Sequence, residues 1–162
     1  MNPTHETDRR DVCPYLPQRK QLPHDVPPWA PEHSRYFITI NCHLRGTNTL
    51  GQEGCAEKLL ESIQVYESLN KWRVFLMLIM PDHVHLIASF NHKLGIQPVV
   101  TSWKGYQTRQ FGIKWQRDFF EHRIRNQAEF TKLYYYVLSN PVRKGLVADW
   151  KDWPYKHVCG VW

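Results

Sequence analysis

Two histidines separated by one residue are the part of this sequence best suited to chemistry. His83 and His85 lie in residues 80–90, where apolar residues and β-formers predict a strand. Side chains along a strand alternate between its two faces, so both imidazoles are expected to point to the same side. Two neutral imidazoles side by side form half of a site for a divalent metal ion. The tripeptide alone is equally compatible with two structural histidines.

A second group of chemically useful side chains lies on a helix predicted over residues 127–140 and ended by Pro141. Lys132, Tyr136 and Asn140 recur every four residues and so form a stripe on the flank of this helix. The neighbouring stripe is apolar and is expected to face the core. That core stripe consists of Phe130, Leu133, Tyr134, Val137 and Leu138.

The combination of a histidine pair, a phenol and a carboxamide is suited to phosphoryl transfer. A metal ion acts as a Lewis acid on a phosphate. Tyrosine is a weak nucleophile at its ordinary pKa of about 10, so it needs a polarised phosphorus and in-line placement. Attack by Tyr136 would leave a covalent phosphotyrosine that stores the energy of the phosphodiester bond. Taken singly, Tyr136 is explained by packing and Asn140 by capping of the helix end.

The positive charge of the chain is concentrated in one quarter of it. The formal net charge is +6, and residues 104–144 contain nine Lys or Arg against three Asp or Glu, whereas the rest of the chain is balanced. A basic block with interleaved aromatic residues favours a polyanionic partner, most often nucleic acid. A solvated basic surface without a partner is the alternative. The candidate DNA contacts are Trp103, Lys104, Arg109, Arg123, Arg125, Lys132, Arg143 and Lys144.

The pattern of apolar residues and turns predicts the order β-α-β-β-α-β followed by a helix. Four strands with two crossover helices form a ferredoxin-like α+β sandwich with an antiparallel four-stranded sheet. The expected strands are residues 35–42, 72–80, 83–90 and 115–124, and the expected helices are residues 53–69, 98–111 and 127–140.

The flanks of this domain differ from it in composition. Residues 1–33 hold seven of the eleven prolines and are expected to be extended. Residues 34–147 are expected to form the catalytic domain. The Trp-rich residues 148–162 are expected to pack on that domain as a C-terminal tail. The four scattered cysteines argue against a zinc ribbon and a disulfide scaffold. We expect a cytoplasmic protein, because the sequence shows no signal peptide and no apolar run of membrane-spanning length. With DNA as its partner, it would be nucleoid-associated.

Four ordered motifs carry a resemblance to a known family. They are Met80-Pro81-Asp82-His83-Val84-His85, the stretch from Trp115 to Arg125, the stretch from Tyr136 to Val147, and Trp153-Pro154-Tyr155. Together they span about residues 35–157 and resemble the single-tyrosine HUH transposases, most closely the REP-associated tyrosine transposases. Asp82 stands where many relatives have asparagine, which we interpret as a variation of the turn.

The resemblance implies a site and an activity. By similarity, His83, His85 and Asn140 would hold Mg²⁺ or Mn²⁺, and Tyr136 would cleave single-stranded DNA at the foot of a hairpin such as a REP-like repeat, keeping the 5′ phosphate. Relatives work as monomers or as homodimers that exchange the tyrosine helix. Two alternatives remain open: a non-catalytic, domesticated DNA-hairpin-binding protein, and a phosphodiesterase that uses water instead of tyrosine.

Overall fold

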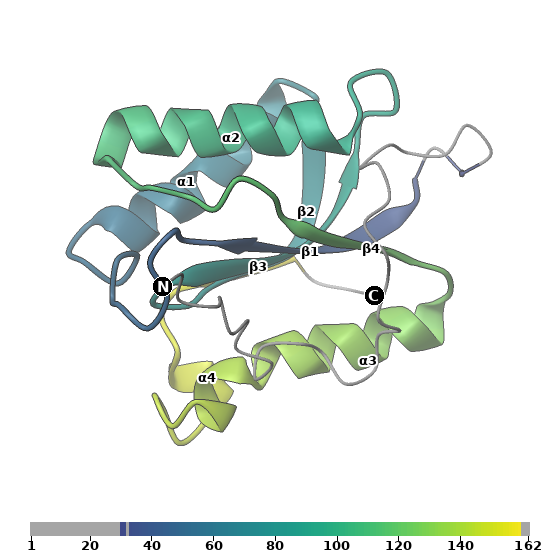
Figure 1. The fold of residues 1–162 in the computed structure, drawn as a ribbon. Helices are drawn as coiled ribbons and strands as arrows, with labels where there is room; N and C mark the ends of the chain where they lie inside the picture. Colours follow the sequence, from purple (N-terminus) through teal and green to yellow (C-terminus); the bar gives the residue numbers. More distant parts are fainter. Residues whose placement is uncertain (1–29, 32, 160–162) are drawn as a thin grey trace, which may run out of the picture.

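The computed structural model describes residues 30–31 and 33–159, and in it an antiparallel sheet separates two layers of helices. In Figure 1, α1 and α2 cover one face of the sheet, and α3 and α4 cover the other. The elements in chain order are β1 (Arg35–Asn41), α1 (Cys55–Ser68), β2 (Trp72–Ile79), β3 (His83–Phe90), α2 (Ile96–Phe111), β4 (Phe120–Ile124), α3 (Gln127–Leu138), α4 (Asn140–Arg143), a 3-10 helix (Trp150–Asp152) and β5 (Lys156–Val158).

The strand order is β4-β1-β3-β2-β5. The first four strands have the predicted ferredoxin-like arrangement, with β1 and β3 at the centre and all pairs antiparallel. The sheet has one strand more than the four that we predicted. The additional strand, β5, pairs with β2 at the edge and places Val158 opposite Leu76. Periodicity missed β5 because a strand of three residues carries too little pattern to be recognised.

Small shifts at element ends have local causes. β4 begins at Phe120, although we predicted a strand from residue 115. Trp115 forms an isolated bridge to Cys42, and then the carbonyls of Gln116 and Arg117 accept hydrogen bonds from Lys104 Nζ at 2.7 and 2.8 Å. A side-chain amine therefore takes the place of a strand partner. Residues 1–29, 32 and 160–162, and with them most of the predicted Pro-rich segment, lie outside the described residues.

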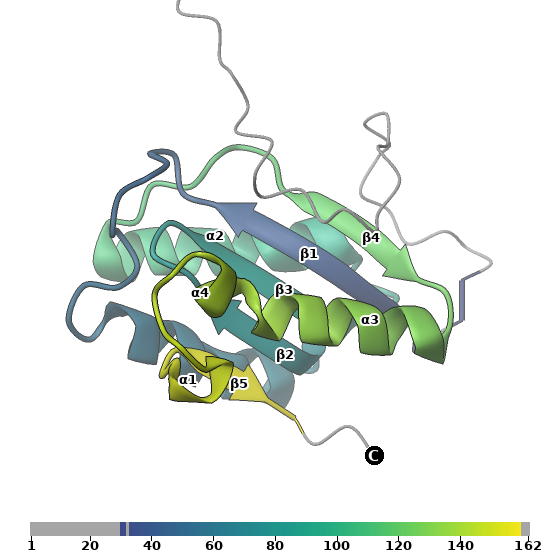
Figure 2. The same ribbon diagram turned by 90° about the horizontal axis from the view of Figure 1, so that it is seen from below.

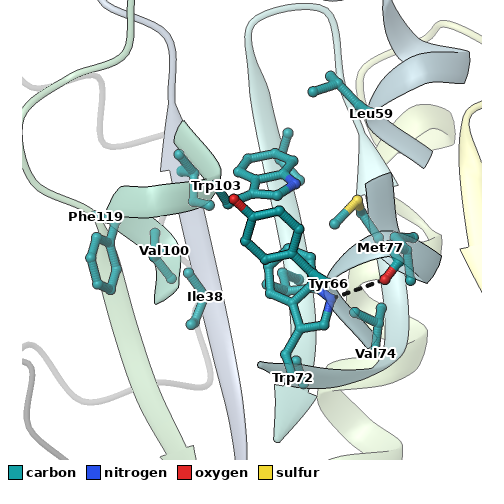
Figure 3. Close-up of a cluster of buried hydrophobic side chains, with 14 of the residues drawn as sticks. Ile38, Leu59, Tyr66, Trp72, Val74, Met77, Val100, Trp103 and Phe119 are labelled. Carbon is teal, nitrogen blue, oxygen red and sulfur yellow. Dashed lines mark hydrogen bonds between the residues drawn. The ribbon is translucent and has the colours of Figure 1, made fainter. Parts of the chain in front are cut away.

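The layer between the sheet and helices α1 and α2 is the larger core, and it contains Trp103. Figure 3 shows Trp103 packed beside Tyr66 and Trp72. Its side chain is completely buried and its Nε1–H donates to Ser62 Oγ at 2.8 Å. The prediction that Trp103 stacks on DNA was therefore wrong: a ring in the core has no face that a base could reach.

The opposite layer is built by α3, and its start is fixed to β4. Asn126 caps the helix, with Oδ1 accepting from the Glu129 N–H at 2.8 Å. Glu129 in turn accepts from the backbone N–H of Arg125 at 2.7 Å, and its other oxygen contacts His122 Nε2 at 2.7 Å. Because β4 and α3 are joined by so few residues and share these bonds, α3 is held against the sheet of its own chain. His122 is a structural histidine.

The end of α3 differs from the prediction. We expected one helix up to residue 140, but α3 ends at Leu138 and a separate short helix, α4, begins at Asn140. Proline has no N–H to donate and its fixed φ suits the first turn of a helix, so Pro141 starts α4 rather than only ending α3. Ser139, between the two helices, keeps helical dihedrals with φ −76° and ψ −9°, so α4 follows directly on α3 (Figure 2). The Arg143 guanidinium then lies over the ring of Tyr136.

Candidate active site

The two histidines converge through the same ring nitrogen. His83 and His85 lie on the face of β3 that α3 covers, and both side chains are almost fully buried. Their Nε2 atoms are 3.2 Å apart, while their rings cross at 80°. The register places His85 opposite Thr39 on β1. As predicted from the alternation of the strand, both imidazoles share one face, and their nitrogens point to one location.

Both Nδ1 atoms are anchored by polar groups. His83 Nδ1 lies 2.7 Å from Asp82 Oδ1, and His85 Nδ1 lies 3.0 Å from Thr39 Oγ1. A carboxylate can only accept, so neutral His83 carries its proton on Nδ1 and presents a lone pair at Nε2. A hydroxyl can donate or accept, so Thr39 is compatible with either tautomer of His85. In the 3.2 Å contact between them, one Nε2 donates to the other. With a metal ion in place of that proton, both imidazoles could offer Nε2 as an acceptor at the same point.

Asp82 is itself fixed by a network from the loop after β1. The Gly46 N–H donates to Asp82 Oδ2 at 2.7 Å, and Arg45 Nη1 lies 3.4 Å from Asp82 Oδ1. Gly46 has a φ of 76°, which a residue with a Cβ rarely adopts. Burial would raise the pKa of Asp82, but the hydrogen bonds from His83 and Gly46 and the charges of His83 and Arg45 lower it to about 2. Asp82 is therefore a carboxylate, and our interpretation of it as a turn variation was incomplete.

Burial also keeps His85 neutral. Removal from water lowers the pKa of His85 well below its ordinary value, and the nearby positive charges of His83, Arg45, Lys144 and Arg143 act in the same direction. A neutral imidazole has the lone pair that a metal ion needs. The electrostatics of the site thus favour a ligand over a charged histidine.

Tyr136 is the tyrosine of α3 that the fold buries most deeply. It is 7% exposed and belongs to the core under α3, whereas Tyr135 is 60% exposed. We predicted Tyr134 in the core and Tyr136 on the flank, but Tyr134 is only partly buried. The guanidinium of Arg143 lies 4.6 Å from the centre of the Tyr136 ring. This contact fixes the ring between α3 and α4.

Asn140 lies at the break between the two helices and is 5% exposed. Its Nδ2 donates to the carbonyls of Tyr136 and Val137, each at 3.3 Å, so the amide nitrogen is engaged by the end of α3. The remaining oxygen is the atom that could bind a cation. Within residues 30–31 and 33–159, no group of three or more His, Cys, Asp or Glu could hold a metal ion.

The site opens into a cavity of about 340 Å³. His83 and Asp82 form part of its wall, and Lys144 and Arg45 add positive charge to it. The cavity is also lined by Gly46, Thr47, Asn48, Met80, Pro81 and Leu146. The imidazole of His83 and the cationic side chains of Lys144 and Arg45 surround an open space that is suited to a phosphate group.

The predicted DNA contacts do not form one surface. Lys144 lines the cavity together with His83, and the charges of Lys144 and Arg143 both act on His85. Arg123 alternates with His122 along β4 and so faces the α1 and α2 side, where its charge acts on Tyr36. Arg109 is exposed in the last turn of α2, on the same distant side.

The other predicted contacts have mixed positions. Lys104 is committed to backbone carbonyls, and this side of the sheet is far from α3. Lys132 is exposed on α3, and Arg125 is exposed just before it. The charge excess of residues 104–144 is therefore divided between both faces of the sheet. Only Arg143 and Lys144 are close to the histidine pair by the contacts above.

Sequence reasoning missed the residues that orient the histidines. Thr39 and Arg45 were not singled out, because one lies in an ordinary strand and the other in a polar loop. The only available signal was the register of β1 against β3, which puts Thr39 opposite His85. This register is known only from the structure, in which the two antiparallel strands are paired.

A ferredoxin-like sheet with a histidine pair on one face, and a tyrosine helix packed over that face, is the arrangement expected of the single-tyrosine HUH transposases. Residues 33–146 match the family described as "Transposase IS200 like". This match covers more than half of the chain, and the protein belongs to that family.

Individual relatives agree with this assignment. The chain is similar to the REP-associated tyrosine transposase of Escherichia coli (strain K12), with 26% identity over 125 residues that cover 74% of this chain and 73% of that protein. It is 35% identical to a putative REP-associated tyrosine transposase of Haemophilus influenzae (strain ATCC 51907 / DSM 11121 / KW20 / Rd) over 95 residues, 48% of this chain and 53% of the relative. The fold is also that of a REP-associated tyrosine transposase solved bound to a REP hairpin, with a TM-score of 0.70 at 22% identity over 87% of this chain and 82% of the other.

No helix in the described part of the chain combines the length and apolar character needed to cross a membrane.

Proposed function

We propose that this protein is a metal-dependent endonuclease and strand transferase that cuts single-stranded DNA near a hairpin through a 5′-phosphotyrosine intermediate. Tyr136 is the nucleophile, and His83, His85 and Asn140 would hold a Mg²⁺ or Mn²⁺ ion. The observation that carries the proposal is the convergence of the two Nε2 atoms, 3.2 Å apart, on the face that the tyrosine helix covers. Family membership and the hairpin bound by a protein of the same fold are consistent with it.

The residues present fit such an ion. Imidazole and amide oxygen are ligands that Mn²⁺ accepts, and each histidine has the outer partner that fixes its orientation. When bound, the ion would withdraw electron density from the scissile phosphate and so favour attack on phosphorus. Asp82 and Thr39 keep the imidazoles in place for that role. Arg143 and Lys144 would balance the charge of the phosphate.

The covalent step exchanges one phosphodiester for another. The Tyr136 oxygen forms a bond to phosphorus while the bond from phosphorus to the 3′ oxygen breaks. The phenol proton is transferred, in net terms, to the leaving oxygen, which becomes a free 3′ hydroxyl. The strand on the other side stays attached to Tyr136 through its 5′ phosphate. Since the phosphodiester energy is retained, a 3′ hydroxyl of another strand can reverse the reaction and rejoin DNA without ATP.

The proposal is tested by looking for the covalent product. Wild-type protein is incubated with end-labelled single-stranded hairpin DNA and Mn²⁺, and then denatured in SDS. We expect label to remain on the protein, and EDTA to abolish it, because phosphorus is not polarised without the ion. Binding without an adduct would favour the non-catalytic protein, and cleavage without an adduct would favour the water-using enzyme.

Asp82 should increase affinity for the ion through His83. The Asp82→Asn variant keeps the size of the side chain but removes the charge that polarises the His83 Nδ1–H. We expect Mn²⁺ affinity to fall about tenfold, measured by isothermal titration calorimetry. Asp118→Asn, at an exposed aspartate, is the matched control. Equal affinity of Asp82→Asn and wild type would show that the carboxylate does not act on the metal site.

Each chain should also contain a complete site. α3 is tied to β4 of its own chain through Glu129, His122 and Arg125, so Tyr136 acts beside the histidines of the same molecule. A mixture of Tyr136→Phe protein with His83→Ala protein should therefore form no adduct, because neither molecule has both halves. Restored adduct, approaching a quarter or more of the wild-type yield, would instead demonstrate exchange of the tyrosine helix between two chains.

A further inference from the structure

A second cavity adjoins the one at the histidines. It measures about 470 Å³, which lies within the roughly 300–1,000 Å³ typical of small-ligand sites. Four residues line both cavities, so the two are direct neighbours: Asn48, Met80, Pro81 and Leu146. The walls differ in chemistry, because Lys144, Arg45 and His83 line only the first cavity, whereas Trp153 and Tyr155 line only the second.

The aromatic wall of the second cavity is rigid. Trp153 Nε1–H donates to the Ile79 carbonyl at 3.0 Å, and the Ile79 N–H donates to the Tyr155 carbonyl at 2.9 Å. The rings of Trp153 and Tyr155 meet edge to face with centres 5.6 Å apart. Trp153 is only partly buried. The polar edge of Trp153 is thus satisfied by the sheet, while other atoms of the residue contribute to the cavity wall.

A carboxamide is positioned where the two cavities meet. Asn48 lines both, and its side chain lies directly over Gly51, where a Cβ would come within 2.2 Å of Asn48 Oδ1. Only glycine leaves room for this position of the amide. An amide offers both a donor and an acceptor to the edge of a nucleobase. The loop before α1 therefore places a group that can distinguish bases beside an aromatic surface that any base can stack on.

We propose that the second cavity binds one unpaired nucleobase of the DNA strand next to the phosphate held at the histidines, with Trp153 as stacking surface and Asn48 as the reader of the base edge. The occupant follows from the adjacency of the two cavities: a strand whose phosphate lies between Lys144 and His83 must place a neighbouring base close by. This inference rests on the proposed function. It also revises our interpretation of Trp153, which we expected only to pack the C-terminal tail.

The test combines protein variants with abasic DNA. Binding of single-stranded hairpin oligonucleotides is measured by fluorescence anisotropy in EDTA, with one base removed at each position in turn. Trp153→Leu fills the space but cannot stack, and Trp153→Phe keeps an aromatic ring. Trp150→Phe is the matched control, because Trp150 packs under α3 nearby without lining the cavity. Thermal unfolding checks that each variant is folded.

We expect one position at which removal of the base weakens binding to wild type about tenfold, as loss of one stacked base does. Trp153→Leu should bind intact DNA about tenfold more weakly and lose nothing further at that position, whereas Trp153→Phe and Trp150→Phe should resemble wild type. Separately, Gly51→Ala, which leaves Trp153 in place, should reduce discrimination among the four bases there.

The experiment distinguishes failure of the base site from failure of the proposed function. No binding of hairpin DNA by wild type would overturn the proposed function and this site with it. Binding in which no abasic position is coupled to Trp153, or an unchanged base preference in a folded Gly51→Ala protein, would overturn the base site alone and leave the proposed function standing.

Discussion

Replacing Tyr136 by phenylalanine should lower the yield of the covalent protein–DNA adduct at least about a thousandfold, since the account makes the Tyr136 oxygen the nucleophile. The ring of Tyr136 packs in the core under α3 and against Arg143, and phenylalanine preserves both contacts. The variant should therefore fold and bind hairpin DNA like the wild type. Initial rates of adduct formation and anisotropy with the same oligonucleotide measure the two effects separately.

The neighbouring tyrosine provides the matched control. Tyr135 has the same chemistry but is 60% exposed, so Tyr135→Phe should leave the adduct unchanged. An adduct that survives in Tyr136→Phe and disappears in Tyr135→Phe or Tyr134→Phe would contradict the assignment of the nucleophile. Loss of DNA binding along with the adduct would indicate that the phenol acts in binding rather than in attack.

Replacing His85 by alanine should have the second largest effect. His85 is neutral, almost fully buried and oriented by Thr39, so its loss removes one of the two converging nitrogens. We expect Mn²⁺ binding to become undetectable by calorimetry and cleavage to fall about a hundredfold or more, because polarisation of the phosphate contributes several kcal/mol to such steps.

Replacing an exposed histidine tests whether the loss of metal binding and cleavage is specific to His85. His43 lies outside the site and is exposed, so His43→Ala should retain both metal binding and cleavage. His85→Ala also opens a small cavity next to Phe37, which stacks on the imidazole at 5.6 Å, so its unfolding midpoint is measured in parallel. A folded His85→Ala protein with full activity in Mn²⁺ would show that the histidine pair is structural.

The fold was largely predictable because local patterns agreed with it. The alternation around His83 and His85, and the pattern of apolar residues and turns along the chain, each indicated the observed elements. The local patterns did not predict the features that depend on contacts between residues distant in the sequence. β5 exists because it finds the free edge of β2, and Trp103 is buried because α2 packs against α1 and the sheet.

The candidate site was predictable in its central residues but not in their surroundings. His-x-His and the spacing from Tyr136 to Asn140 are visible in the sequence. The break at Ser139 is not, because a proline can end one helix or begin the next, and only the packing of α4 decides. Net charge was equally uninformative about position: Arg123 and Arg143 count alike in the sequence, yet they lie on opposite sides of the sheet.

The most direct test of the central claim is to locate the covalent bond. Wild-type protein is reacted with hairpin DNA and Mn²⁺, digested with nuclease and trypsin, and analysed by tandem mass spectrometry. The account predicts a nucleotide attached through its 5′ phosphate to Tyr136, and none in the sample with EDTA. A modified peptide whose nucleotide maps to another side chain, or cleaved DNA without any modified peptide, would contradict it.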